Sequence, residues 1–211
     1  HLKRLLGRQQ VHSGFWAFLS DAELQTRGLS TAAQENLVLS KGHDHDMLMF
    51  NPFWDVSAFH RNPFLLAEQL RPGSLEAAQA FADTLGLDVR LVDWVCCSDH
   101  FLLGMNFVAK RRIWLDWLEL TNRLMCSQDP RIVSHRDVLY ALSGNYMVLL
   151  AKLSVHAVDP FSLPALGKPS PDLLEQAMAC DALKVSHVRS GHERYLTQHA
   201  RLATLALAVS H

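Results

Sequence analysis

The feature that most constrains this chain is an alternation of short apolar runs with longer amphipathic segments. The runs at residues 15–19, 47–50 and 101–109 predict buried strands, because each is short and bounded by polar or turn-forming residues. Residues 110–127 instead carry large apolar side chains every three or four positions, which predicts a helix with one wide apolar face. This alternation predicts an α/β fold in which a small mixed sheet has extensive helical cover.

Capping and turn signals place the other elements. Capping boxes begin at Ser20 and Thr31, and Pro72-Gly73 separates two helical segments. We expect further helices over residues 20–28, 31–42, 55–70, 74–85, 137–155, 173–183 and 193–209, and a further strand over 89–95.

A proline-rich connector divides the chain. Residues 159–171 contain four prolines, and the segment that follows has helical signals of its own. We therefore expect an α/β core over residues 1–158, with the connector and C-terminal helices of residues 159–211 packed on the same domain. A length of 211 residues suits one substantial domain.

Composition excludes several classes of protein. Apolar residues make up 49% and charged residues 19%, which indicates a packed core. The 20 basic and 21 acidic residues give a net charge of −1 without long like-charge runs, so no nucleic-acid partner is expected. No apolar stretch reaches the roughly 18 residues of a membrane span. The chain begins without Met and is expected to be a fragment or processed product of a cytoplasmic protein.

Four potential metal ligands follow one another at His43, Asp44, His45 and Asp46. Alternate residues of an extended segment point the same way, so the two histidines or the two aspartates could share one divalent ion. The alternative is a solvated turn in which the aspartates bond nearby backbone groups.

Two further groups have both a structural and a functional interpretation. Cys96 and Cys97 lie close in sequence to His100, so either thiol could be a nucleophile, although packed, reduced thiols are the simpler expectation. Trp114 and Trp117 could form a sugar-stacking platform, but their helical spacing favours burial in the core.

The sequence contains no Walker loop, GxGxxG, GxSxG or HExxH motif.

Several short segments resemble, in the same order, a family of bacterial glycosyltransferase-like proteins linked to surface and capsular polysaccharides. The segments are Phe15-Trp-Ala-Phe-Leu-Ser20, Gln25-Thr-Arg-Gly-Leu29, Leu48-Met-Phe-Asn51-Pro-Phe-Trp-Asp55, Arg61-Asn62, Pro72-Gly-Ser-Leu75, Ala78-Gln-Ala-Phe-Ala-Asp83 and Gly104-Met-Asn106-Phe-Val-Ala-Lys110 with the helix that follows. The resemblance covers roughly residues 14 to 127.

The resemblance implies a nucleotide-sugar transferase whose α/β core resembles part of a GT-A fold. Such enzymes often hold Mn²⁺ or Mg²⁺ with a DxD motif that follows a strand, where the ion offsets charge on the diphosphate. Here Asn51-Pro-Phe stands after the strand at 47–50, and the DxD-like Asp44-His-Asp46 precedes it. The resemblance thus implies a Mn or Mg ion, whereas the candidate ligands His43 to Asp46 come from their own spacing and stand at the other end of the strand from the family's motif.

Candidate catalytic and binding residues lie at strand ends and on the next helix. Asp55 or Glu68 would act as general base on an acceptor hydroxyl, with Asn51, Asn62 and Asn106 binding substrate. Asn51 and Asp55 have an alternative role as caps of the following helix. The partners would be a nucleotide sugar and a glycan acceptor.

A second reading makes the chain a non-catalytic interaction module. The displaced DxD and the lack of recognisable N-terminal nucleotide-binding strands favour a degenerate transferase scaffold that docks a partner. The two readings are a glycosyltransferase of bacterial surface polysaccharide assembly and a module that keeps only its scaffold.

Overall fold

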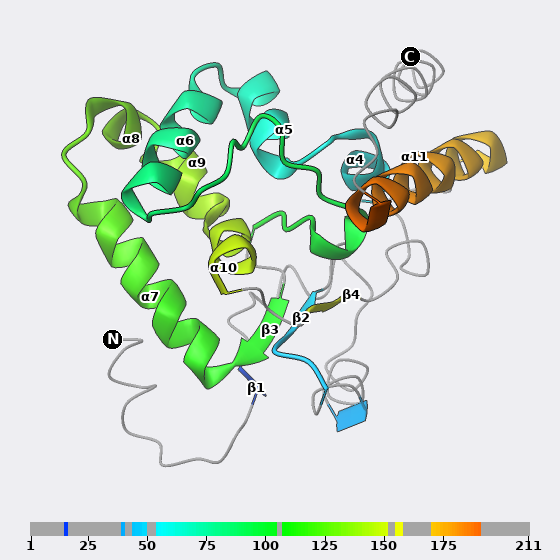
Figure 1. The fold of residues 1–211 in the computed structure, drawn as a ribbon, viewed down its shortest axis with the longest axis horizontal. Helices are drawn as coiled ribbons and strands as arrows, with labels where there is room; N and C mark the ends of the chain where they lie inside the picture. Colours follow the sequence, from blue (N-terminus) through cyan, green and yellow to red (C-terminus); the bar gives the residue numbers. More distant parts are fainter. Residues whose placement is uncertain are drawn as a thin grey trace.

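The computed structural model describes residues 15–16, 39–40, 44–49, 54–104, 107–151, 155–157 and 170–190. Over these ranges the protein is a mixed α/β structure, mostly helical, with helices gathered around a small sheet (Figure 1). The helices predicted over 20–28 and 193–209 lie outside the described residues, as does most of the segment 31–42 and of the connector.

Among the described residues the sheet has four short strands: β1 Phe15–Trp16, β2 Met47–Met49, β3 Phe107–Lys110 and β4 Val155–Ala157. Their spatial order is β1-β3-β2-β4, so the sheet is not built in chain order. β3 runs antiparallel to β1 and β2, whereas β2 and β4 are parallel. The prediction that the segments 15–19, 47–50 and 101–109 contribute neighbouring strands to a small mixed sheet is confirmed for the residues described.

The third strand is shorter than predicted. Of the residues described between 101 and 109, only 107–109 belong to β3, and a 3-10 turn, η1 Ser98–His100, precedes the segment. The backbone of Leu102 pairs with the side chain of Asn145, which accepts its N–H at 3.1 Å and donates to its carbonyl at 3.0 Å. A side-chain amide thus takes the place of a neighbouring strand at this residue.

The single helix predicted over 55–70 is two helices, α4 Trp54–Phe59 and α5 Pro63–Leu70. Pro63 occupies the first turn of α5, where its missing N–H costs nothing. Asn62, the residue before it, is extended with φ −158° and ψ 165°, as steric contact with a following proline favours. The Asn-Pro pair therefore ends one helical segment and begins the next.

The helix predicted over 137–155 is also wrong in detail. The chain forms α8 Pro130–Ser134, α9 Arg136–Ala141 and α10 Ser143–Ala151, and Val155 belongs to β4. The break falls at Leu142, slightly before Gly144, where a bend was expected. β4 was missed because its three residues pair with β2, which is distant in sequence.

No strand forms over 89–95, which corrects that prediction. The backbone groups of this segment bond to side chains. The N–H of Leu91 donates to Gln79 at 2.8 Å, and the carbonyls of Leu91 and Trp94 accept from Asn62. These side chains satisfy the backbone hydrogen-bonding groups of Leu91 and Trp94, so no pairing with a neighbouring strand is needed.

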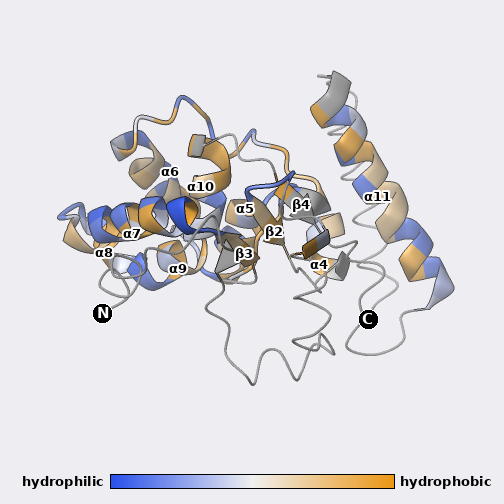
Figure 2. Cartoon of the chain, turned by 90° about the horizontal axis from the view of Figure 1, so that it is seen from below, coloured by the Kyte–Doolittle hydropathy of each residue, from blue (hydrophilic) through white to orange (hydrophobic). Residues whose placement is uncertain are grey.

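The predicted helices over 74–85 and 110–127 are confirmed as α6 Ser74–Thr84 and α7 Arg111–Cys126. Hydrophilic and hydrophobic residues alternate along α7, as expected of a helix with one buried face (Figure 2). Trp114 is fully buried and stacks on Phe107 of β3 at 4.8 Å between ring centroids. Trp117 is 4% exposed and donates its indole N–H to Ser143 at 2.7 Å, so the prediction that both rings are core residues is confirmed.

The last described helix, α11 Pro171–Ser190, begins near the predicted start and continues beyond residue 183. It packs against α4 at one side of the molecule (Figure 1). Buried side chains at this contact include Ala58, Phe59, Ala177 and Cys180. The division into residues 1–158 and 159–211 stays a prediction. None of the described helices is long and apolar enough to span a bilayer.

Candidate functional site

The predicted site residues are only partly within the described ranges. Asn51, Asn106 and His43 lie outside them, and Asp55 lies in the first turn of α4. The predicted cleft past the end of β2, lined by Asn51, Asp55, Glu68 and Asn106, therefore stays a prediction.

Asn62 is buried, and its side chain makes three hydrogen bonds to the backbone. Its oxygen accepts the N–H of Leu65 at 2.9 Å, which caps α5. Its amide nitrogen donates to the carbonyls of Leu91 at 2.9 Å and Trp94 at 2.7 Å. These contacts use both donor hydrogens, so the side chain joins the start of α5 to the segment over 91–94.

Glu68 lies in α5 and accepts hydrogen bonds from the start of α6. Its two carboxylate oxygens accept the N–H groups of Leu75 at 2.7 Å and Gly73 at 3.0 Å. Gly73, with φ +90°, is the N-cap residue of α6 and has no side chain to cap it. Hydrogen bonds from Leu75 and then Gly73 lower the pKa of Glu68 below its ordinary value. A carboxylate held ionised in this way is a weak general base near neutral pH.

We expect Glu68→Gln to reduce stability by about 1 kcal/mol at pH 7, because a neutral amide replaces the ionised cap of α6. The lowered folded-state pKa makes the contribution of the carboxylate complete above the ordinary glutamate range. That contribution is lost as the pH falls through the folded-state pKa. Thermal melts of parent and variant should therefore converge in acid, and a constant difference down to pH 2 would contradict the assignment.

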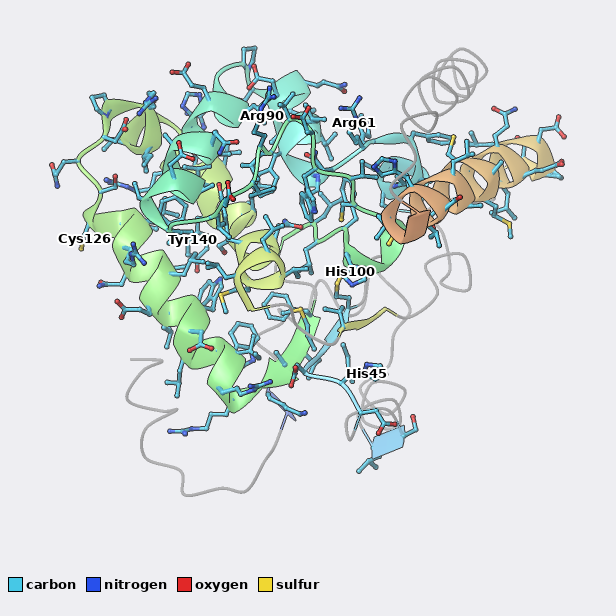
Figure 3. All side chains as sticks on the ribbon, in the orientation of Figure 1. His45, Arg61, Arg90, His100, Cys126 and Tyr140 are labelled. Atoms are coloured by element: carbon cyan, nitrogen blue, oxygen red, sulfur yellow. The ribbon has the colours of Figure 1, made fainter. Side chains whose placement is uncertain are left out.

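The DxD-like segment lies beside two cationic residues, Lys110 and Arg112. Asp44 is exposed, His45 is half-buried, and both precede β2 (Figure 3 labels His45). The carboxylate of Asp46 accepts from Lys110 at 3.3 Å and from Arg112 at 2.5 Å. Its backbone carbonyl accepts the N–H of Lys110, which extends the pairing of β2 with β3.

The metal prediction for this segment gains no support from the geometry. Among the described residues, no three His, Cys, Asp or Glu side chains are grouped to hold an ion. Both cations contact the same carboxylate oxygen of Asp46, which a metal would have to share or take over. A Mn or Mg ion bound by Asp44 and Asp46, with His43 and His45, stays a prediction.

The junction of β3 with α7 carries a concentration of positive charge. Lys110, Arg111 and Arg112 occupy the N-cap and first two positions of α7, and its first turn has no acidic residue. The helix dipole is also positive at this end, so basic residues here are unfavourable unless an anion lies near them. Asp46 supplies one negative charge.

A second polar group is buried where α4, η1 and α11 meet. Lys184 is fully buried, and its ammonium group donates to the carbonyls of Ser57 and His60. Asp181 lies 3.5 Å from that ammonium and accepts from both the N–H and the hydroxyl of Ser98. Burial lowers the pKa of Lys184, and burial followed by the Lys184 charge lowers the pKa of His60.

Sequence reasoning did not single out Lys110, Arg112, Asp181 or Lys184. The sequence did contain a signal for Lys110 and Arg112. They belong to a basic triplet that directly follows an apolar strand, and basic residues are unusual at the start of a helix. For Lys184 and Asp181 no local signal exists, because a lysine and an aspartate three residues apart on a helix ordinarily form an exposed pair.

The chain was compared with protein families, curated proteins and solved structures. No protein-family model, curated protein or solved structure matches this chain.

Proposed function

We propose that this chain is a nucleotide-sugar-dependent glycosyltransferase, or a domain of that type, acting in bacterial surface polysaccharide assembly. The observation that carries the proposal is the convergence of Lys110 and Arg112 on Asp46 at the start of α7. The motif resemblance and the mixed α/β fold are consistent with it.

The charge at this junction suits a nucleotide diphosphate. Sugar transfer breaks the bond between the sugar and the diphosphate, so negative charge builds up on the leaving oxygen. Cationic side chains and helix N–H groups fixed beside that oxygen stabilise the transition state more than the ground state. Lys110, Arg111 and Arg112 lie on one turn next to such N–H groups. In the proposal they hold the diphosphate, and the Asp46 carboxylate orients Lys110 and Arg112.

The geometry separates the two candidate bases. Glu68 is committed to the amides at the start of α6, and its lowered pKa works against proton removal from a hydroxyl. Asp55, in the first turn of α4, is therefore the proposed general base. It would take the proton of the acceptor hydroxyl as that oxygen attacks the sugar.

We expect Arg112→Met to weaken nucleotide-sugar binding by about 10-fold or more, the loss typical of one charge-assisted hydrogen bond. Calorimetric titration with UDP-, GDP- and dTDP-linked hexoses measures this. Arg90→Met is the matched control, since Arg90 is an exposed arginine far from the β3–α7 junction (Figure 3). Equal affinities in both variants would exclude the junction as the diphosphate site.

Titration with and without Mn²⁺ tests the metal prediction in the same assay. Binding that requires Mn²⁺ and is lost in an Asp44→Ala, Asp46→Ala protein would favour a metal-held diphosphate. Nucleotide-sugar binding by the parent without any sugar transfer or hydrolysis would favour the non-catalytic interaction module.

A further inference from the structure

Cys97 and His100 are brought together by the local geometry of η1. A 3-10 turn has three residues per turn, so residues three apart lie on the same face. Cys97 immediately precedes η1, and its carbonyl accepts the N–H of His100 at 2.9 Å. Its sulfur lies 3.5 Å from Nδ1 of His100. A thiol and a possible proton acceptor are thus in contact.

The turn that holds this pair is anchored on two helices. Ser98 donates its N–H and its hydroxyl to Asp181 of α11 at 2.8 and 2.7 Å. The hydroxyl of Ser57 in α4 donates to that of Ser98 at 3.2 Å. These bonds fix η1 on both sides, so the contact between Cys97 and His100 is pre-organised.

The two adjacent cysteines differ. The thiol of Cys96 donates to the carbonyl of Cys97 at 3.5 Å, which favours its protonated form. Cys97 instead faces the imidazole nitrogen of His100. A base in contact with a thiol can take its proton and so generate the thiolate, which is the nucleophilic form.

Cys96 and Cys97 line a cavity of about 220 Å³ between η1, α10 and α11. His100 also lines this cavity, and much of the remaining wall is apolar, with Trp94, Val148 and Val188. A small uncharged molecule fits such a lining better than an ion, because a charge would lose its hydration there.

We propose that Cys97 is a nucleophilic thiol, with His100 as its proton acceptor, that adds to small uncharged α,β-unsaturated carbonyl compounds in this cavity. The thiol proton passes to Nδ1 of His100, and the sulfur forms a bond to the β-carbon. The π-electron pair of the C=C bond moves to give an enolate. His100 then returns the proton to the α-carbon, so the addition is complete without a leaving group. This site is independent of the proposed diphosphate site.

The test is timed labelling of the folded protein with N-ethylmaleimide, followed by mass spectrometry of each cysteine. The chain supplies two internal controls. Cys126 is exposed and lies at the far end of α7 from His100 (Figure 3). Cys180 is buried, and burial raises its pKa to about 11, so its labelling reports unfolding.

We expect Cys97 to react about 10-fold faster than Cys126 in spite of its burial, since base-assisted proton transfer accelerates such steps by this much or more. His100→Gln should reduce the rate at Cys97 about 10-fold while the rate at Cys126 stays constant. Val188→Trp, which fills the cavity, should slow Cys97 selectively.

Cys96→Ser and Cys97→Ser variants assign the label to one of the two adjacent thiols. Labelling of Cys97 slower than that of Cys126, an unchanged rate in His100→Gln, or labelling of Cys96 in place of Cys97 would each overturn the proposal. If Cys180 becomes reactive in His100→Gln, that variant has partly unfolded, and the labelling rates of Cys97 and Cys126 are compared in His100→Asn instead. An unchanged rate at Cys97 in His100→Asn would then overturn the proposal.

Discussion

Replacing Trp117 by alanine is expected to lower the free energy of unfolding by about 3–5 kcal/mol. The ring is 4% exposed, packs edge-on against Trp114 at 5.7 Å and lies 5.6 Å from the ring of Tyr140. Truncation removes these contacts from a core that packs against the sheet, and the surroundings cannot fully collapse into the space. It also leaves the buried hydroxyl of Ser143 without the indole donor.

Chemical denaturation monitored by circular dichroism measures this change. Trp117→Phe is the matched variant, because it keeps most of the ring volume and removes only the N–H donor, so its cost should be smaller. Val133→Ala, at a side chain that is 45% exposed, should change stability by less than about 0.5 kcal/mol. An unfolding midpoint of Trp117→Ala equal to that of the parent would show that the ring does not support the core.

The helices that sequence reasoning placed best are those whose signals are local. α7 was predicted almost to its ends, because its apolar period spans the whole helix. α6 follows Pro72-Gly73, and that punctuation fixed its start. The break at Asn62-Pro63 also has a local signal, because a proline favours an extended conformation in the residue before it, although the segment 55–70 was predicted as one helix.

The strands were harder to place, since a strand is defined by its partner. β4 is three residues long and forms only because Met47 to Met49 offers an edge in parallel register. Residues 101–103 have a strand-like composition, yet Leu102 pairs with the amide of Asn145. Whether such a segment becomes a strand depends on a partner more than forty residues away along the chain. A local sequence pattern holds no information about that partner.

In the candidate site, too, the sequence indicated single residues but not their long-range contacts. The carboxylate of Asp46 was predicted as a ligand from the spacing of the four residues His43 to Asp46. Its contact with Lys110 and Arg112 follows from the register that places Met47 opposite Ala109. The proximity of Cys97 to His100 was visible in the sequence, but the anchoring of their turn by Asp181 of α11 comes from tertiary packing.

Asn62→Ala is expected to destabilise the protein by about 2–4 kcal/mol. The loss of the cap on α5 accounts for about 1 kcal/mol. The buried carbonyl of Leu91 also loses its donor, which costs about 1–3 kcal/mol. The carbonyl of Trp94 is only partly buried, so the loss of its donor costs less.

Asn62→Asp separates the two contributions. Aspartate keeps the acceptor for the N–H of Leu65, but it cannot donate, and it places a negative oxygen beside two carbonyls. We therefore expect it to be at least as destabilising as alanine, although aspartate is an excellent helix cap at exposed positions. Denaturant titration of both variants measures the difference.

The same variants decide between the structural role of Asn62 and the substrate-binding role that the family resemblance implies. Because the amide already makes three backbone hydrogen bonds, nucleotide-sugar binding per folded molecule should be unchanged in Asn62→Ala. Calorimetric titration at a temperature where the variant remains folded gives that value. A variant as stable as the parent that no longer binds nucleotide sugar would show that Asn62 contacts the substrate, and that its hydrogen bonds to the 91–94 segment contribute little to the fold.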